Sequence, residues 1–179
     1  VYDLYAANFT ILEWRERILR MVPIYPTRVM LMSRSDRQIE DAGDLEGARV
    51  VTRPSTSYER ILLALQSELN AKFTILYSED DFADALLADQ ADAAAIDSEV
   101  ALSNIRDQRD LRISVELSDA QLIGWAFHPD DQVLAELFKR FIGEAFSSGL
   151  LDQLWYAEYR FSLSEYAELI GYDLRDELY

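Results

Sequence analysis

The sequence predicts an α/β fold, and three observations support this prediction. Apolar runs of strand length alternate with segments of helical period along most of the chain. Half of the 179 residues are hydrophobic, which is enough for a sizeable core in one large domain or two small lobes. A polar connection, residues 35–47, separates two alternating parts. This pattern is typical of a mostly parallel sheet covered by helices.

The first part begins with an apolar strand over residues 2–7, followed by a short helix over residues 12–19. Two prolines keep residues 22–26 out of a helix, so a turn is expected there. A strand over residues 27–33 follows and leads into the polar connection.

The second part is interpreted as one βαβαβαβ lobe, because apolar runs and helical periods alternate strictly within it. The strands are expected over residues 49–52, 73–77, 91–96 and 111–116, and the helices over residues 57–69, 81–88 and 99–106.

A further apolar strand, residues 122–127, precedes a long helical region that breaks near residues 147–149. Its apolar positions keep a helical period and are expected to pack in the core. They are Val133, Leu134, Leu137, Phe138, Phe141, Ile142, Ala145 and Phe146. The last residues, 162–179, are expected to form an amphipathic helical tail. Its apolar side carries Leu163, Tyr166, Leu169 and Ile170.

Charge and composition exclude several functions. Seventeen basic residues against thirty-three acidic ones give a net charge of −16, which repels nucleic acid and anionic lipid. The acidic residues are spread over helix faces and loops, which favours solubility over a metal site. The chain has no cysteine, so disulfides and thiol catalysis are excluded. No apolar run reaches the ~18 residues of a membrane span. We expect no metal, cofactor, nucleic acid or direct membrane insertion.

The segment around the end of the first strand carries side chains that can hold a carboxylate. Asn8 and Thr10 lie near the strand end, and Arg15 follows about one helical turn later. Ligands of open α/β sheets bind at the carboxyl ends of strands, and an arginine that folds back presents a bidentate fork to a carboxylate. A surface arginine on a loop is the alternative.

Two later strand ends are also candidates for binding. Ser55, Thr56 and Ser57 open a helix, where free N–H groups and hydroxyls favour an anionic group. Thr56 and Glu59 also have capping-box spacing, so a structural cap is the alternative. Asp97 ends an apolar strand, where it is either a helix N-cap or the partner of a ligand ammonium group.

Catalytic candidates are few. The single histidine, His128, precedes a proline at a strand end, where a solvated loop position is favoured over a general base. The sequence contains no Gly-rich phosphate loop and no nucleophile elbow. No catalytic residue is therefore assigned, and the sequence favours a binding function.

Taken in order, these segments resemble the type II periplasmic solute-binding proteins of family 3, which bind polar amino acids. Residues 8–15 resemble the family's hydroxyl and arginine motif, and residues 44–51 its entry into the second lobe. Residues 55–59 are similar to its "GTTxE" helix start, and residues 91–97 to its "xDAxxxD" strand. Within the family, residues 5–10, 124–127 and 147–151 are most similar to the sensor modules of membrane-bound lytic murein transglycosylases.

The resemblance implies a two-lobed Venus-flytrap fold. Its expected parts are residues 1–34 as part of lobe one, 35–119 as lobe two, 120–161 as the return to lobe one, and 162–179 as the tail. The family's first quarter is missing before Val1, and the chain starts without methionine, so upstream residues are expected.

The resemblance also implies the roles of the site residues in an interlobe cleft. Arg15 and Thr10 would hold the α-carboxylate of an amino acid or short peptide, including a murein-derived one, while Asp97 and Ser57 would hold its ammonium group. Tyr25 falls at the family's proline-tyrosine turn, and Asn8, Ser55 and Thr56 complete the set: Asn8, Thr10, Arg15, Tyr25, Ser55, Thr56, Ser57 and Asp97.

Three functions remain open. The chain is a periplasmic solute-binding or sensor module that works with an ABC-transporter permease or a fused enzyme domain. Alternatively, it is the non-catalytic regulatory portion of a lytic murein transglycosylase, whose glycan-cleaving domain this chain does not contain. The third reading is a degenerate binding fold that acts as a protein-interaction domain.

Overall fold

A computed structural model describes residues 3–70 and 72–178 of the chain. It folds into two units, of which the first comprises Val1–Thr27 and Ala120–Tyr179, and the second comprises Arg28–Asp119. The predicted α/β class and two-lobed architecture are confirmed. The first crossing between units lies at Thr27 and Arg28, before the predicted boundary at residue 34, because the next strand belongs to the second sheet.

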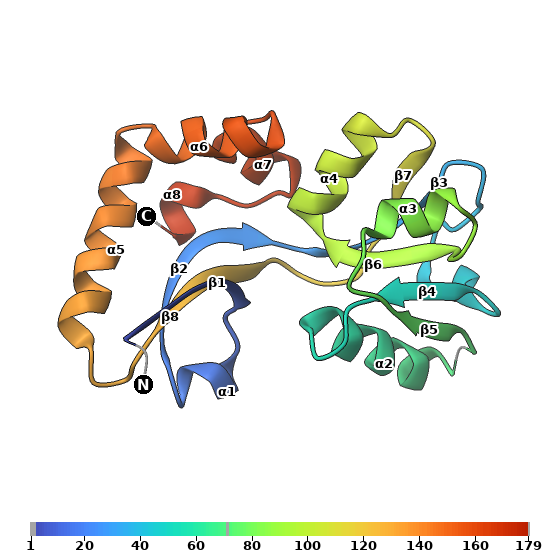
Figure 1. Cartoon of the computed structure of the whole chain (residues 1–179), viewed down its shortest axis with the longest axis horizontal. Coiled ribbons are helices and arrows are strands. Elements are labelled where there is room, and N and C mark those ends of the chain that lie inside the picture. The colour runs from blue at the N-terminus through green and yellow to red at the C-terminus, as the bar shows by residue number, and fades with distance from the viewer. Residues whose placement is uncertain (1–2, 71, 179) are drawn as a thin grey trace. The chain divides into compact units, whose positions relative to one another are not determined.

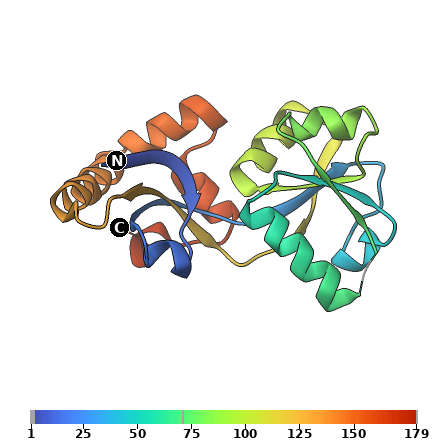
Figure 2. The ribbon, with the colours of Figure 1, turned by 60° about the horizontal axis from the view of Figure 1, so that its bottom comes forward.

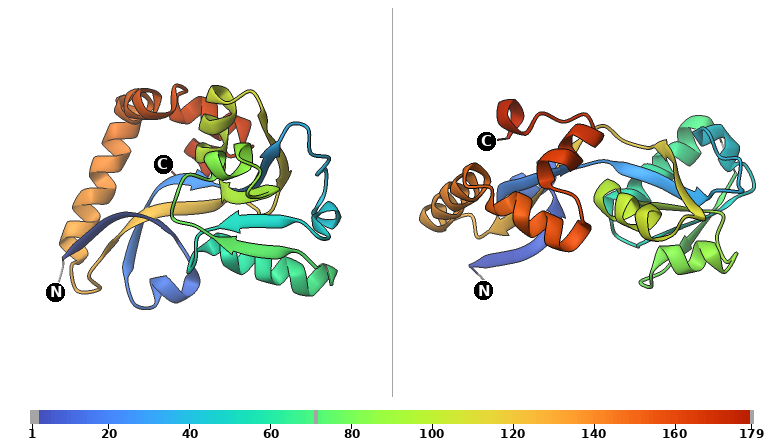
Figure 3. Two further views of the ribbon diagram at one scale, coloured as in Figure 1. Left: turned by 45° about the vertical axis from the view of Figure 1, so that its right-hand side comes forward. Right: turned by 90° about the horizontal axis from the view of Figure 1, so that it is seen from above.

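The first unit is built on a three-stranded antiparallel sheet in the order β1-β8-β2. Its elements are β1 (Leu4–Thr10), α1 (Glu13–Glu16), β2 (Arg20–Thr27), β8 (Gln121–Phe127), α5 (Gln132–Ser147), α6 (Leu150–Tyr159), α7 (Leu163–Leu169) and α8 (Leu174–Glu177). Figure 3 shows α6 running in a different direction from α5. The chain turns at Gly149, whose φ of +75° favours glycine, so the predicted helix break is confirmed.

The turn predicted at residues 22–26 is wrong, because these residues lie within β2 and pair with β8. Pro23 and Pro26 fit there because β2 is an edge strand, where a missing N–H leaves no ladder bond unmade. The pairing shifts register between Pro23 and Tyr25. The expected first helix is correspondingly short and ends at Glu16.

Helix α5 packs on β2 with one face and exposes an apolar stripe on another. Ala135, Ile142 and Ala145 are buried, and Phe138 stacks on Trp125 with ring centroids 4.7 Å apart. The core packing expected for four further apolar positions is wrong, because they are exposed: Val133, Leu134, Leu137 and Phe141. Helical period alone did not distinguish the two faces.

The second unit contains a mixed five-stranded sheet in the order β5-β4-β6-β3-β7. Its elements are β3 (Val29–Arg34), the 3-10 helix η1 (Ala42–Leu45), β4 (Arg49–Thr52), α2 (Ser57–Leu69), β5 (Thr74–Tyr77), α3 (Phe82–Leu87), β6 (Ala93–Asp97), α4 (Ser98–Asp107) and β7 (Leu111–Glu116). Helix α2 covers one face of this sheet, and α3 and α4 cover the other (Figures 1 and 2). The bounds predicted for β4, α2 and β7 are confirmed.

The prediction of a mostly parallel sheet is wrong. β4 runs parallel to β5 and β6, whereas β3 runs antiparallel to β6 and β7. The strand that enters the second unit from the first is inserted between β6 and β7, so that it reverses the local direction of the sheet. The carboxyl ends of β4, β5 and β6 still meet at one edge.

Candidate functional site

In the first unit, the predicted arginine folds back onto the end of its strand. The Arg15 guanidinium donates from Nη1 to the Thr10 carbonyl oxygen at 2.7 Å. It also lies 5.5 Å from the ring centre of Phe9 and 5.1 Å from that of Trp14, so two aromatic faces hold it by cation–π contact. Thr10 is buried, with 7% of its surface exposed. The structure therefore brings Thr10 and Arg15 together.

Asn8 and Tyr25 have different surroundings. Asn8 is exposed in β1, within the stretch where pairing with β8 shifts register between Tyr5 and Phe9. The Tyr25 ring is buried against Trp155 in an edge-on contact, with ring centroids 4.6 Å apart. Packing accounts for Tyr25, and its role in ligand binding stays a prediction.

In the second unit, the residues before α2 form a helix cap. Thr56 Oγ1 accepts from the Glu59 N–H at 3.4 Å and donates to the Arg53 carbonyl at 2.7 Å. The Glu59 carboxylate reaches back to the Ser55 N–H at 2.7 Å, one residue earlier than in a standard capping box. The Tyr77 hydroxyl and this N–H lower the pKa of Glu59.

Ser55 adopts a φ of +60°, the left-handed conformation that favours glycine. Ser57 is the first residue of α2 and is 7% exposed. The cap thus uses the Thr56 side chain and the Ser55 N–H, and Ser57 follows as the first residue of a helix of 13 residues.

Asp97 is not explained by helix capping. It occupies the N-cap position of α4, yet its side chain makes no capping hydrogen bond. Instead the carboxylate, on a residue that is 8% exposed, accepts a hydrogen bond from the Tyr58 hydroxyl. Burial of the phenol, together with the neighbouring Asp97 charge, raises the pKa of Tyr58, which therefore remains a donor.

Sequence reasoning missed Tyr58, which contacts Asp97, and Thr52 at the end of β4. Tyr58 lies in the first turn of α2, and Thr52 ends β4 with a fully buried side chain. The signals were present, since Thr52 is a polar side chain closing an apolar strand and Tyr58 follows a helix start. Glu99, in the first turn of α4, is a further buried carboxylate, 2% exposed.

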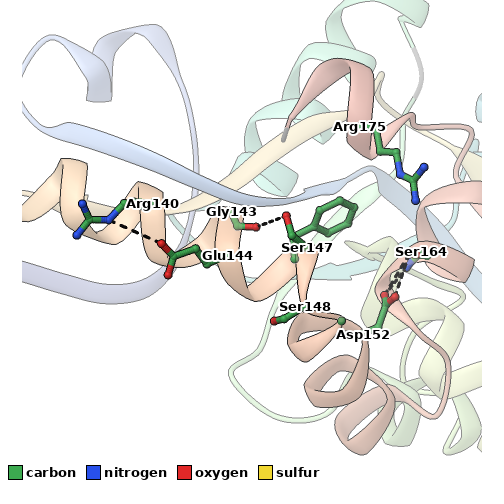
Figure 4. A pocket seen from close by; sticks show the side chains of 10 residues that line it. Arg140, Gly143, Glu144, Ser147, Ser148, Asp152, Ser164 and Arg175 are labelled. Atoms are coloured by element: carbon green, nitrogen blue, oxygen red, sulfur yellow. Dashed lines mark hydrogen bonds and ion pairs between the residues drawn. The ribbon is translucent and has the colours of Figure 1, made fainter.

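A separate hollow of 1170 Å³ lies in the first unit, lined by residues of α5, α6, α7 and α8 (Figure 4). Its lining polar groups largely satisfy one another: Asp152 accepts from the Ser164 N–H at 2.9 Å, and Ser147 donates to the Gly143 carbonyl at 2.8 Å. None of the predicted site residues lines it. Within residues 3–70 and 72–178, no helix is both long and apolar enough to span a bilayer, and no three acidic or histidine side chains form a metal-binding group.

Several solved structures share this fold, and their names identify the class of fold. A putative L-cystine ABC transporter protein from Listeria monocytogenes has a TM-score of 0.76 at 19% identity, covering 89% of this chain and 72% of that one. The amino acid ABC transporter substrate-binding protein AbpA from Streptococcus pneumoniae, bound to L-arginine, has a TM-score of 0.75 at 19% identity, with coverages of 88% and 68%. A mutant of ArgBP from T. maritima has a TM-score of 0.72 at 22% identity, with coverages of 88% and 69%. The chain has the two-lobed fold of the amino-acid-binding periplasmic proteins.

Among curated proteins, the chain is similar to membrane-bound lytic murein transglycosylase F from Desulfosudis oleivorans. The two are 26% identical over 158 residues, which is 86% of this chain and 35% of the relative. The chain therefore spans about a third of that protein's length. No family model matches the sequence. The resemblance predicted from the sequence motifs is confirmed by these two comparisons.

Proposed function

We propose that the chain is a non-catalytic, extracytoplasmic binding module for a small zwitterion, either a free amino acid or a short peptide. The observation that carries this proposal is the placement of two opposite charges at strand ends, one in each unit. Arg15 is held at the end of β1, and the Asp97 carboxylate at the end of β6 is turned away from its helix cap. Neither side chain has the geometry of a simple surface charge.

A zwitterionic ligand carries a partner of opposite sign for each of these two charges. Arg15 and Thr10 would hold a carboxylate, and Asp97 and Ser57 would hold an ammonium group through charge-assisted hydrogen bonds. A dicarboxylate would place a second negative charge near Asp97, and a neutral sugar would offer an opposite charge to neither Arg15 nor Asp97. Asn8, Tyr25, Ser55 and Thr56 are kept in the proposed set with these four residues.

The names of the relatives support the ligand class and suggest the setting. Similar structures include proteins described as bound to L-arginine or as an L-cystine transporter component, so amino acids are the first ligands to test. This likeness supports the proposal of a periplasmic module that delivers its ligand to a permease. The similarity to lytic murein transglycosylase F favours a second candidate, a regulatory portion that binds a murein-derived peptide for a fused or partner enzyme domain.

Thermal unfolding in the presence of the twenty L-amino acids and of murein peptides tests the proposal. A ligand at 100 times its Kd stabilises the folded chain by about 2.7 kcal/mol, or roughly 5–10 °C in a protein of this size. We expect Arg15→Ala and Asp97→Ala to abolish the shift. The matched controls Arg17→Ala and Asp130→Ala remove exposed charges and should retain it. If no ligand shifts the wild-type chain, the binding proposal fails and the protein-interaction reading takes its place.

A further inference from the structure

Three polar side chains gather on the α2 face of the second sheet. Thr52 follows Val50 by two residues in β4, and Asp97 follows Ala95 by two residues in β6. Val50 and Ala95 belong to the core cluster against which Tyr58 packs. Because side chains alternate between faces along a strand, Thr52 and Asp97 share this face with Tyr58 at the carboxyl edge.

The Tyr58 ring and its hydroxyl have separable roles. The ring packs partly buried against the apolar cluster beneath α2, a contact that phenylalanine would also make. The hydroxyl donates to Oδ2 of Asp97, and this bond spans 39 residues of sequence. Since a carboxylate with one oxygen held by a buried donor cannot rotate freely, the phenol fixes the plane of the Asp97 carboxylate.

The edge also holds a polar group to which none of the described residues donates or offers a hydrogen bond. Thr52 is fully buried, and among the described residues its Oγ1 has no hydrogen-bond partner. Buried hydroxyls are normally satisfied by protein, ordered water or ligand. An edge with a fixed carboxylate and a hydroxyl that needs a partner is organised for a polar ligand group.

We propose that Tyr58 is a positioning residue of the ligand site, whose hydroxyl holds the Asp97 carboxylate in the orientation that receives the ligand ammonium group. The inference rests on the proposed function, because it assigns Tyr58 to the same site. It adds a residue that acts through Asp97 and does not itself contact the ligand.

The test is the affinity of Tyr58→Phe for the twenty L-amino acids, measured by calorimetry over a range of pH. We expect a loss of about 10- to 100-fold, the range for a hydrogen bond to a charged group. The hydroxyl also stabilises the ionised form of Asp97, so its removal raises the pKa of that carboxyl. Binding by the variant should therefore fall off at a higher pH than binding by the wild type. Glu99 and Arg53, the other charged groups that act on Tyr58, are unchanged in it.

Three controls separate positioning from general damage. Tyr156→Phe makes the same change at an exposed position of α6 and should bind like the wild type. The double variant Tyr58→Phe/Asp97→Asn should bind no more weakly than Asp97→Asn alone, because the hydroxyl acts through that carboxylate. The thermal midpoint of Tyr58→Phe without ligand checks that it folds.

Unchanged affinity in Tyr58→Phe would overturn the inference while leaving the proposed function intact. An equal loss at every pH would also overturn it, because that result indicates only structural damage. If the losses of affinity caused by Tyr58→Phe and Asp97→Asn add up in the double variant, the inference is likewise overturned. A wild-type chain that binds none of the amino acids or murein peptides would overturn the proposed function itself, and the inference with it.

Discussion

Replacing Tyr166 by phenylalanine tests whether the C-terminal residues belong to the core of the first unit. Tyr166, in α7, is fully buried, and its hydroxyl donates to the Pro26 carbonyl in β2 at 2.9 Å. Its ring packs on Trp155 and Phe161, with centroid separations of 5.2 and 6.0 Å. The substitution keeps the ring and removes one buried hydrogen bond across 140 residues of sequence.

The size of the effect follows from the burial of this bond. A typical intramolecular hydrogen bond contributes about 0.5–1.5 kcal/mol, and a buried acceptor left without its donor costs about 1–3 kcal/mol. Because Tyr166 has no exposed surface, little water can replace the lost donor. We expect Tyr166→Phe to lower the free energy of unfolding by about 2 kcal/mol, or roughly 4–8 °C in the thermal midpoint.

Tryptophan fluorescence reports on the correct unit, because Trp14, Trp125 and Trp155 all lie in the first one. Urea unfolding should show a lower midpoint for Tyr166→Phe with an unchanged slope, which indicates a change in stability alone. Tyr156→Phe, at a 55% exposed position, is the matched control and should unfold like the wild type. Wild-type stability in Tyr166→Phe would refute the reasoning and would mean that residues 162–179 form a separate tail.

Two further predictions concern the two sheets. Gly124→Ala should strongly destabilise the first unit, because a Cβ there would lie 2.2 Å from the Val22 carbonyl oxygen, and tryptophan fluorescence in urea would register it. In the second unit, Arg49 donates a hydrogen bond to Asp92 and lowers the pKa of that carboxyl. The pairing therefore stabilises the fold fully above the pKa of Asp92 in the unfolded chain, about 3.9. This stabilisation is lost as the pH falls through the lower pKa of Asp92 in the folded chain. Asp92→Asn should lower the midpoint of unfolding at pH 7, as measured by circular dichroism. The difference in midpoint between this variant and the wild type should narrow below about pH 4. A difference in midpoint that does not change with pH would contradict this prediction.

The sequence predicted the fold correctly where the local residue pattern favours the same element that the tertiary structure contains. In the second unit, the bounds of β4, α2 and β7 follow from apolar runs and cap residues. The segment 22–26 failed because its two prolines disfavour regular structure unless the strand is at a sheet edge. Edge position depends on the order of β1, β8 and β2, which brings together residues about 100 positions apart, and no local pattern encodes it.

The same distinction separates the two halves of the candidate site. Arg15 and Thr10 are five residues apart, so one strand end and one turn of helix bring them together, and the sequence sufficed to predict it. The Tyr58 bond to Asp97 requires α2 to cross β6 in one particular register. From the sequence, Asp97 had a complete explanation as a helix cap. The structure removes that explanation, because the Asp97 carboxylate makes no hydrogen bond to cap α4 and instead accepts one from the Tyr58 hydroxyl of α2. The case for a binding function in the second unit rests on this contact.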